Sequence, residues 1–562
     1  MSNPVWQGQY PKGVSQTINL DQYSSLIALM EESFEKFADK ESFYCMGVCL
    51  TYRELDMQSR QFASFLQNHT DLKPGDRIAI QMPNLIQYPI ALFGALRAGM
   101  VVVNTNPLYT AREMEHQFTD ANVKALVVLA NFADKLQAIL PKTEIRTVII
   151  TEIGDMMPFP KRQIVNFAVK YIKKMVPPYS LPQALSFREV LAKGKDKPFQ
   201  RVEVDKESNA FIQYTGGTTG VAKGAELSHR NMLANMLQIQ AWMCIRANEG
   251  KETIITALPM YHIFCLTVNC FAFTAFGAKN ILITNPRDMP AFIEELKKHK
   301  FTALTGVNTL FNGLLNQPNI GEVDFSHLKL AVGGGMAVQK AVAERWQEAT
   351  GCPLVEGYGL TEASPVLCCN PVDGTERIGT IGLPMPSTEI MIADDDGNPV
   401  AQGERGELWG RGPQVMRGYW KRPEATEGVL TPDGWLKTGD IAVMTEDGFF
   451  KIVDRKKDMI LVSGFNVYPN EVEDTIALHP KVLEVAVIGV SDEKSGEAVK
   501  AVIVAKDPSL TKEELKEHCK EHLTGYKQPR HYAFIAAEKM PKTNVGKILR
   551  RELKEMDKAG NL

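Results

Sequence analysis

Residues 214–224 read YTGGTTGVAKG, which places four glycines, three threonines and one lysine within eleven residues. Glycines let backbone amides approach phosphate oxygens closely, threonine hydroxyls add hydrogen-bond donors, and a lysine adds a positive charge. The stretch therefore predicts a polyphosphate-binding loop. A flexible surface linker would not explain the apolar FIQ run at 211–213 before it or the helix start HRNML at 229–233 after it.

The loop differs from the P-loop of kinases and ATPases. In the pattern GxxxxGK[ST], a glycine precedes the lysine and a serine or threonine follows it. Here Ala222 and Gly224 flank Lys223. A P-loop protein is therefore disfavoured, and a different phosphate-binding architecture is expected.

The first 350 residues alternate short β-branched runs with capped amphipathic segments, a layout typical of parallel α/β structure. Helix starts are predicted where Thr51 is followed by Glu54 and Thr110 by Glu113, because each pair fits a capping box. Buried strands are predicted at RIAIQM (77–82), KALVVL (124–129), TVIIT (147–151) and TIITAL (253–258).

From about residue 380 the sequence changes to short runs divided by Gly, Pro and Asp, which are turn signals between β-strands. The turns include DDDGN (394–398), GERGEL (403–408) and TEDGFF (445–450). This part of the chain predicts a β-rich subdomain.

A charged string, DRKKD at 454–458, precedes a last unit of about 100 residues with its own α/β pattern. Strands are predicted near 459–462, 485–490 and 499–505, and helices from Pro469 and from the capping box Thr511/Glu514. We place the main domain boundary at the charged string. A solvated turn between two strands is the alternative, and the pattern alone does not decide between them.

Composition limits the classes of function. A chain of 562 residues exceeds what one hydrophobic core usually supports, so more than one domain is expected. A net charge of -3 does not indicate the excess of positive charge that nucleic-acid binding requires, and we expect no nucleic-acid partner. Nine cysteines without CxxC pairs indicate a reducing compartment, and an N-terminus without a secretory pattern indicates a cytoplasmic location.

Residues 253–278 contain no Asp, Glu, Lys or Arg, and the run is long enough to span a bilayer on length alone. Pro259, His262 and Asn269 interrupt it. A buried interior helix or the wall of an apolar substrate channel is therefore favoured over a membrane span.

Four further motifs follow the phosphate loop: GYGLTE (357–362), WLKTGD (435–440), DRKKDMILVSGFNVYPNEVE (454–473) and PKTNVGKILRREL (541–553). In this order, the five segments resemble the phosphate, adenine and magnesium, ribose, hinge and C-terminal lysine motifs of the adenylate-forming superfamily. The block DGWLKTGDIAVMTEDGFFKIVDRKK (433–457) is similar to the stretch that marks fatty-acyl-CoA synthetases. The resemblance spans nearly the whole chain and is closest to the bacterial long-chain fatty-acid CoA ligases.

The resemblance implies an acyl-CoA synthetase-like α/β fold with a large N-terminal domain of α/β layers and a β-rich subdomain (1–454). A hinge (455–458) and a small, mobile C-terminal α/β domain (459–562) would follow. The implied reaction converts ATP, a long-chain fatty acid and coenzyme A into acyl-CoA, AMP and diphosphate through an acyl adenylate, with Mg²⁺. Ligases that load a carrier protein and medium-chain acyl-CoA synthetases are the alternatives.

By the same resemblance, the phosphates would contact Thr215, Gly216, Gly217, Thr218, Thr219, Gly220 and Lys223 in the loop, and Thr361. Thr215 and Glu362 would bind Mg²⁺, and Asp440 would accept hydrogen bonds from the ribose hydroxyls with help from Arg455. The rest of the nucleotide pocket would comprise Gly333, Gly334, Gly335, Glu356, Gly357, Tyr358, Gly359 and Ile452.

Lys547 is the predicted catalytic cation for adenylation, acting with Thr215, Glu362 and His262. As a cation, Lys547 needs no perturbed pKa for this role. His262 would border the acyl and thiol channel, and a purely structural role is left open. Rotation about Lys457 would later bring Gly464 to the site, where a residue without a side chain leaves room for the pantetheine arm of coenzyme A.

Residues 161–175, KRQIVNFAVKYIKKM, carry five basic residues, no acidic ones, and apolar residues at helical spacing. A peripheral contact with an anionic membrane, on the inner face of the cell membrane, is one interpretation. An ordinary surface helix with its apolar face in the core is the other. A homodimer is also left open.

Overall fold

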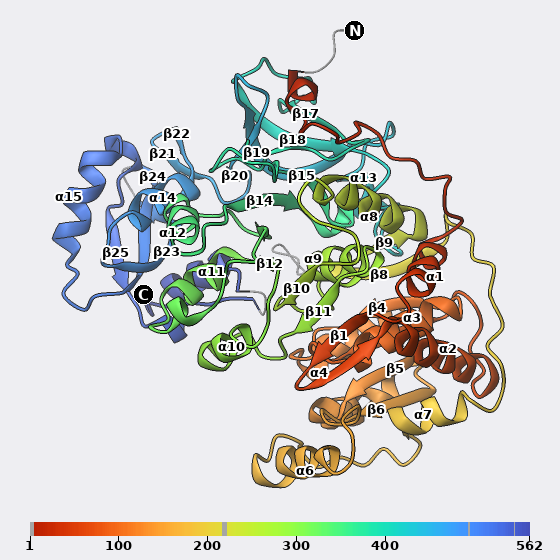
Figure 1. Cartoon of the computed structure of the whole chain (residues 1–562). Helices are drawn as coiled ribbons and strands as arrows, with labels where there is room; N and C mark the ends of the chain where they lie inside the picture. The colour runs from red at the N-terminus through yellow and green to blue at the C-terminus, as the bar shows by residue number, and fades with distance from the viewer. Residues whose placement is uncertain (1–4, 216–221, 493–494, 544–545) are drawn as a thin grey trace.

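The computed structural model describes residues 5–215, 222–492, 495–543 and 546–562. Figure 1 shows two large layered sheets with their helices, a β-rich part above them, and a separate C-terminal unit at one side. The loop residues Gly216, Gly217, Thr218, Thr219 and Gly220 lie outside the described residues.

The sheet that carries the phosphate loop has the strand order β7-β6-β5-β3-β4-β8-β9. Its strands are β3 (Arg77–Gln81), β4 (Val101–Asn104), β5 (Val123–Leu129), β6 (Thr147–Thr151), β7 (Leu185–Ser186), β8 (Asn209–Thr215) and β9 (Lys223–Ser228). All pairings are parallel except the β8–β9 hairpin. The predicted strands at 77–82, 124–129 and 147–151 are confirmed. Their sequences are continuously apolar because helices cover both faces of a parallel sheet.

The second sheet has the order β16-β15-β14-β13-β12-β10-β11-β1-β2. Its strands are β1 (Glu41–Cys45), β2 (Val48–Thr51), β10 (Thr253–Thr256), β11 (Lys279–Leu282), β12 (Ala303–Gly306), β13 (Leu330–Gly334), β14 (Leu354–Gly359), β15 (Val366–Cys369) and β16 (Leu383–Pro384). The strands from β14 to β1 pair in parallel, and antiparallel strands close both edges.

Helices cover both sheets, and one large hydrophobic cluster joins them. They are α1 (Leu26–Lys36), α2 (Tyr52–Asn68), α3 (Gln87–Arg97), α4 (Ala111–Asp120), α5 (Ala133–Ile139), α6 (Lys161–Phe167), α7 (Phe187–Lys193), α8 (His229–Met243), α9 (Ile263–Cys265), α10 (Met289–Leu296), α11 (Asn308–Leu315), α12 (Lys340–Thr350) and α13 (Pro423–Glu427). Both predicted capping boxes are present, at Thr51 with Glu54 and at Thr110 with Glu113.

The predicted β-rich part is an antiparallel sheet of β17 (Glu389–Ala393), β18 (Arg405–Arg411), β19 (Leu436–Met444) and β20 (Phe450–Arg455). It lies above the second sheet in Figure 1, and β19 and β20 run toward the C-terminal unit. The ends of β19 and β20 therefore lie where the large domain meets the C-terminal unit.

The C-terminal unit contains a mixed sheet of β21 (Ile460–Val462), β22 (Phe465–Val467), β23 (Val482–Asp492), β24 (Gly496–Ala505) and β25 (His531–Phe534). Its helices are α14 (Pro469–Ala477), α15 (Lys512–His522) and α16 (Arg550–Lys558). The helix starts predicted at Pro469 and at the Thr511/Glu514 capping box are confirmed. Its hydrophobic clusters are separate from those of the large sheets.

The uncharged run 253–278 is internal, as one of its two favoured interpretations predicts. It forms β10, α9 and a π-helical segment, η5 (Leu266–Phe273), whose residues are all buried. The side-chain amide of Asn269 is buried and hydrogen-bonded: it donates to Thr256 Oγ1 at 3.2 Å and accepts from Thr305 Oγ1 at 2.9 Å. Its burial therefore leaves neither polar atom of the amide unpaired. Within the described ranges, none of the helices combines the length and apolar content needed to cross a membrane.

Candidate active site

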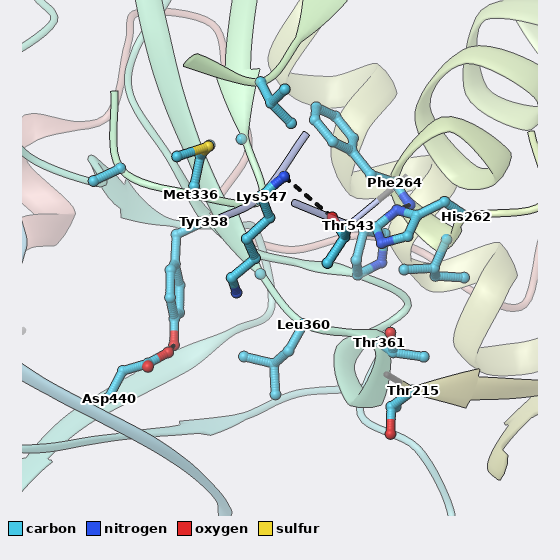
Figure 2. Close-up of a pocket in the computed structure, with 18 of the residues that line it drawn as sticks. Thr215, His262, Phe264, Met336, Tyr358, Leu360, Thr361, Asp440, Thr543 and Lys547 are labelled. Carbon is cyan, nitrogen blue, oxygen red and sulfur yellow. Dashed lines mark hydrogen bonds between the residues drawn. The ribbon is translucent and has the colours of Figure 1, made fainter. Parts of the chain in front are cut away.

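A cavity of about 1750 Å³ lies where the two large sheets, the β-rich sheet and the C-terminal unit meet. Residues from all five motif segments line it. Figure 2 shows Lys547 extending into this space, with Tyr358 and Asp440 on one side and His262 on the other. The fold thus gathers residues that are hundreds of positions apart in the sequence.

The described ends of the phosphate loop are held by the β8–β9 hairpin. Thr215, the last residue of β8, is paired with Lys223, the first residue of β9, and both line the cavity. The Lys223 Nζ lies 5.2 Å from the centre of the Tyr419 ring. The hairpin therefore fixes where the loop leaves and rejoins the sheet, while the predictions for residues 216–220 stay predictions.

Glu362 belongs to the short 3-10 turn η7 (Thr361–Ala363), and both Thr361 and Glu362 line the cavity. The Tyr419 hydroxyl donates to Glu362 Oε1 at 2.5 Å. Burial, followed by the charge of Glu362, raises the pKa of Tyr419, so the phenol keeps its proton and orients the carboxylate. The sequence analysis missed Tyr419, since no local pattern marks it.

Tyr358, Asp440 and Arg455 come from three strands, β14, β19 and β20, and meet at one wall of the cavity. The Tyr358 hydroxyl donates to Asp440 Oδ2 at 2.6 Å, and Arg455 Nε lies 3.4 Å from Asp440 Oδ1. Burial raises the pKa of Tyr358 well above its ordinary value. The carboxylate is thus oriented from two sides, with lone pairs left for a diol.

The glycine-rich wall lies at the ends of β13 and β14. A Cβ on Gly334 would lie 3.0 Å from the carbonyl oxygen of Gly357, and Gly335 has a positive φ of 76°. Gly334, Gly335, Gly357, Gly359 and Ile452 line the cavity, whereas Gly333 is buried and is not among the lining residues.

Glu356 lies beside this wall, and burial raises the pKa of its carboxyl to about 8. The backbone N–H of Val338 donates to Glu356 Oε2 at 3.2 Å. At neutral pH the carboxyl therefore retains its proton, which makes it a hydrogen-bond donor as well as an acceptor.

Lys547 reaches the cavity from a tight loop that packs against the large domain. Its backbone N–H donates to Thr543 Oγ1 at 3.1 Å, and Thr309 Oγ1 of α11 donates to the carbonyl oxygen of Gly546 at 3.2 Å. Burial and the nearby guanidinium of Arg455 lower the pKa of Lys547 to about 7. The pKa is lowered because the lysine lies in a confined site beside another cation.

His262 also lines the cavity, and its Nδ1 accepts from the backbone N–H of Phe264 at 3.4 Å, at the start of α9. Burial and the charge of Lys547 lower the pKa of His262 to about 4. The imidazole is therefore neutral at physiological pH, and it caps a helix as well as bordering the site.

The residues that line the cavity include a group of apolar side chains, here called the apolar arm. These residues come from α8, η5, the second sheet and the connection after β15; they are Ile239, Trp242, Met243, Val268, Phe273, Ala303, Leu330, Val332 and Val372. A wall of this composition favours a hydrocarbon chain over a polar group.

Lys457 lines the cavity in the turn after β20, whereas Gly464 is not among the lining residues. Gly464 lies in the turn between β21 and β22 with a φ of 84°, and a Cβ there would meet no atom within 4 Å. Of the predicted site residues that the structure describes, all except Gly333 and Gly464 line the cavity.

Arg550, which the sequence analysis did not single out, links α16 to α14. Its Nε and Nη2 donate to the two carboxylate oxygens of Glu473 at 3.1 and 2.7 Å. Asp454 and Asp458 lie 3.5 and 3.4 Å from its Nη1. These contacts attach the start of α16, which follows the Lys547 loop, to α14 of the C-terminal unit.

Comparison with known proteins agrees with this arrangement. The family described as "AMP-binding enzyme" matches residues 30–420, and the family "AMP-binding enzyme C-terminal domain" matches residues 471–547. The chain belongs to the AMP-binding enzyme family.

Among its relatives, a long-chain-fatty-acid–CoA ligase from Yersinia pestis is 57% identical over 551 residues, 98% of each chain. Among solved structures, ATP-bound MatB from Rhodopseudomonas palustris is 27% identical with a TM-score of 0.82, covering 95% of this chain and 100% of that one. The anthranilate CoA ligase AuaEII in complex with anthranoyl-AMP has a TM-score of 0.86 at 24% identity, covering 97% and 99%. The predicted family and fold class are confirmed.

Proposed function

We propose that this chain is a long-chain fatty-acid–CoA ligase that works through an acyl adenylate. The observation that carries the proposal is that one cavity is lined both by Lys547, Asp440 and Glu362 and by the side chains of the apolar arm. The relatives that match over 98% of the chain carry this activity in their names.

In the first half-reaction, a carboxylate oxygen of the fatty acid attacks the α-phosphorus of ATP, and diphosphate leaves. Two anions must approach each other, so the site has to neutralise charge and hold the reactants in line. Lys547 supplies a cation between carboxylate and phosphate, and Thr215 and Lys223 stand where the phosphates would lie. Residues 216–220 would add backbone amides to the same cradle.

The nucleotide would be held by the wall that Tyr358, Asp440 and Arg455 form. Asp440 accepts from the ribose hydroxyls, and Tyr358 keeps its carboxylate in place. The protonated Glu356 carboxyl offers a donor to the adenine, beside a glycine wall that leaves room for a planar base.

Mg²⁺ fits the oxygen groups on this side of the cavity. Magnesium commonly takes one or two carboxylates together with substrate phosphates, and Glu362 and Thr215 offer a carboxylate and a hydroxyl. Among the described residues, no cluster of three or more His, Cys, Asp or Glu forms a separate metal site. Bound Mg²⁺ would offset the charge of the triphosphate, while Tyr419 holds Glu362 in position.

In the second half-reaction, the sulfur of coenzyme A attacks the acyl carbonyl and AMP leaves. Lys547 occupies part of the cavity in the arrangement seen here, so the C-terminal domain (459–562) would rotate about Lys457 within the hinge 455–458. Rotation would carry Lys547 out and bring Gly464 in. The adenylate already carries a good leaving group, so no nucleophilic side chain is required.

A cytoplasmic location stays a prediction from the sequence, which leaves a homodimer open. The same holds for the role of His262 beside the channel, for which neutral imidazole and helix capping are the supporting observations.

A CoA-thioester assay over carboxylates from acetate to oleate tests the proposal. We expect release of AMP and acyl-CoA that depends on free coenzyme A and is fastest with oleate. Each methylene buried in the arm contributes about 0.8 kcal/mol. A preference for octanoate would favour the medium-chain alternative, and adenylate formation without turnover on free coenzyme A would favour carrier-protein loading.

A further inference from the structure

One surface of the large domain combines exposed apolar side chains with positive charge. It comprises residues 159–175, here called the basic apolar patch, and contains α6 and the π-helical turn η4 (Ala168–Ile172). Neither element has a buried residue. Figure 1 shows α6 projecting at the bottom of the view, below β5 and β6.

The patch is held by its polar side. Asn166 accepts from the backbone N–H of Gly154 at 2.8 Å and donates to Glu152 Oε2 at 2.9 Å and to Asp155 Oδ1 at 3.3 Å. Asn131 Nδ2 donates to the carbonyl oxygen of Met175 at 3.0 Å. The polar contacts of Asn166 therefore attach the segment to the large domain, and only the smaller apolar residues Val165, Ala168 and Val169 are half-buried beside it.

The outward side is apolar. Fifteen large hydrophobic side chains are exposed among the described residues, and six of them fall within these seventeen positions. The six are Phe159, Ile164, Phe167, Tyr171, Ile172 and Met175. Phe159 is 79% exposed and Ile172 is 71% exposed. The interpretation of residues 161–175 as a surface helix with its apolar face in the core is therefore wrong.

The charges of the patch are all positive. Lys161, Arg162, Lys170, Lys173 and Lys174 are its charged residues, and residues 161–175 contain no Asp or Glu. Among the side chains that the structure describes, none of the five forms an ion pair. The acidic groups nearby, Glu152 and Asp155, lie on the inward side with Asn166.

We propose that the basic apolar patch docks this protein on the surface of an anionic lipid membrane. Aromatic and aliphatic side chains of this kind insert at the boundary between headgroups and acyl chains, and lysines beside them pair with anionic headgroups. The charge of the patch complements such a surface, and an enzyme with an apolar acyl arm would take its substrate from the same phase. A protein partner would need both an apolar and an acidic face at this position.

Vesicle flotation of the full-length protein tests the inference without any substrate. The vesicles are phosphatidylcholine alone or phosphatidylcholine with about 30% phosphatidylglycerol, which supplies the negative surface charge that attracts basic segments. We expect the wild type to float with anionic vesicles and to be released when salt is raised to about 1 M, where the Debye length falls to about 3 Å.

Two variants separate the charge from the apolar contact. The triple change Lys170→Glu, Lys173→Glu and Lys174→Glu should lower binding to anionic vesicles at least about tenfold. The double change Phe167→Ser and Ile172→Ser should lower it by a similar factor. All five side chains lie at the surface, so folding, checked by thermal denaturation, should be retained.

A control variant carries the same change in net charge elsewhere. Lys516, Lys539 and Lys558 are exposed residues of the C-terminal unit that do not line the cavity. Changing all three to Glu should leave vesicle binding within about twofold of wild type, since charge far from the surface is screened.

Wild-type protein that fails to float with anionic vesicles would overturn the inference and leave a protein as the partner of the patch. Equal binding by the wild type and the Lys170/Lys173/Lys174 variant would also overturn it. Because no ATP, fatty acid or coenzyme A is present, these outcomes are independent of the proposed ligase activity.

Discussion

Lys547 is the residue on which the proposed adenylation chemistry depends. Burial and Arg455 lower its pKa to about 7. The lowered pKa means that the charged form is disfavoured, so at pH 8 about nine-tenths of the free protein holds a neutral lysine. A triphosphate placed beside the amine would favour the ammonium and raise the pKa again.

Binding of ATP at pH 8 should therefore be coupled to proton uptake. We expect close to one proton per ATP bound, measured by calorimetry in buffers of different ionisation enthalpy, and much less at pH 6, where the lysine is already charged. The variant Lys547→Arg keeps the charge without titrating, so it should lose the pH 8 uptake. Equal proton uptake by the wild type and Lys547→Arg would assign the proton to another group.

At this scale, sequence motifs indicate which residue types stand in the site, and burial decides what those residues do. Tyr419 donates to Glu362 across 57 positions, and no local pattern records that contact. The neutral His262, the protonated Glu356 and the lowered pKa of Lys547 all depend on packing by distant segments. Such properties follow from the fold and could not be predicted from the motifs.

At the scale of elements, Gly546 is the point where the Lys547 loop contacts α11. Its φ is 84°, and a Cβ would lie 2.5 Å from Thr309 Oγ1. Left-handed backbone costs a residue with a side chain about 1–2 kcal/mol, and the contact adds a steric cost. Both costs apply when the loop is docked against α11.

The change Gly546→Ala should therefore slow adenylate formation about tenfold or more, while thioester formation from supplied acyl adenylate stays within about threefold. Single-turnover assays of the two half-reactions measure this. The control is Gly560→Ala, where φ is also positive, at 70°, and no atom lies within 4 Å of a Cβ. A loss shared equally by both half-reactions would refute a role for this contact in adenylation.

The element η5 forms one wall of the apolar arm, with Val268 and Phe273 facing the cavity. The change Val268→Phe should shorten the space for the acyl chain. If four methylenes lose their place, about 3 kcal/mol of burial is lost. We expect kcat/KM for oleate to fall at least about tenfold relative to octanoate, with KM for ATP unchanged as the internal control. An unchanged oleate-to-octanoate ratio would place the acyl chain elsewhere.

Strands and helix starts with local signals were predictable at this scale. The runs at 77–82 and 147–151 and the capping boxes carry their signal within a few residues. The π-helical path of η5 was not predictable, because a uniformly apolar run has no periodicity to read. Nor was the pairing of β1 with β11, which joins segments more than two hundred residues apart.

At the scale of the whole molecule, the arrangement places Lys547 in the cavity and Gly464 outside it. One chain must therefore adopt two arrangements if both half-reactions are to occur. The change Lys457→Pro would fix φ at the proposed hinge. We expect it to slow thioester formation at least about tenfold and adenylation by less than about threefold.

Lys457→Ala is the matched control, since it removes the same side chain and leaves the backbone free. It should retain both half-reactions within about threefold. Comparable losses in Lys457→Pro for both half-reactions would place the hinge elsewhere in the chain.

The most direct test of the account compares two half-reactions in Lys547→Ala: oleate-dependent exchange of labelled diphosphate into ATP, and thioester formation from supplied oleoyl adenylate. The account predicts that exchange falls at least about a hundredfold while thioester formation stays within about threefold of the wild type. Equal loss of both, or no exchange by the wild type with Mg·ATP and oleate, would contradict it.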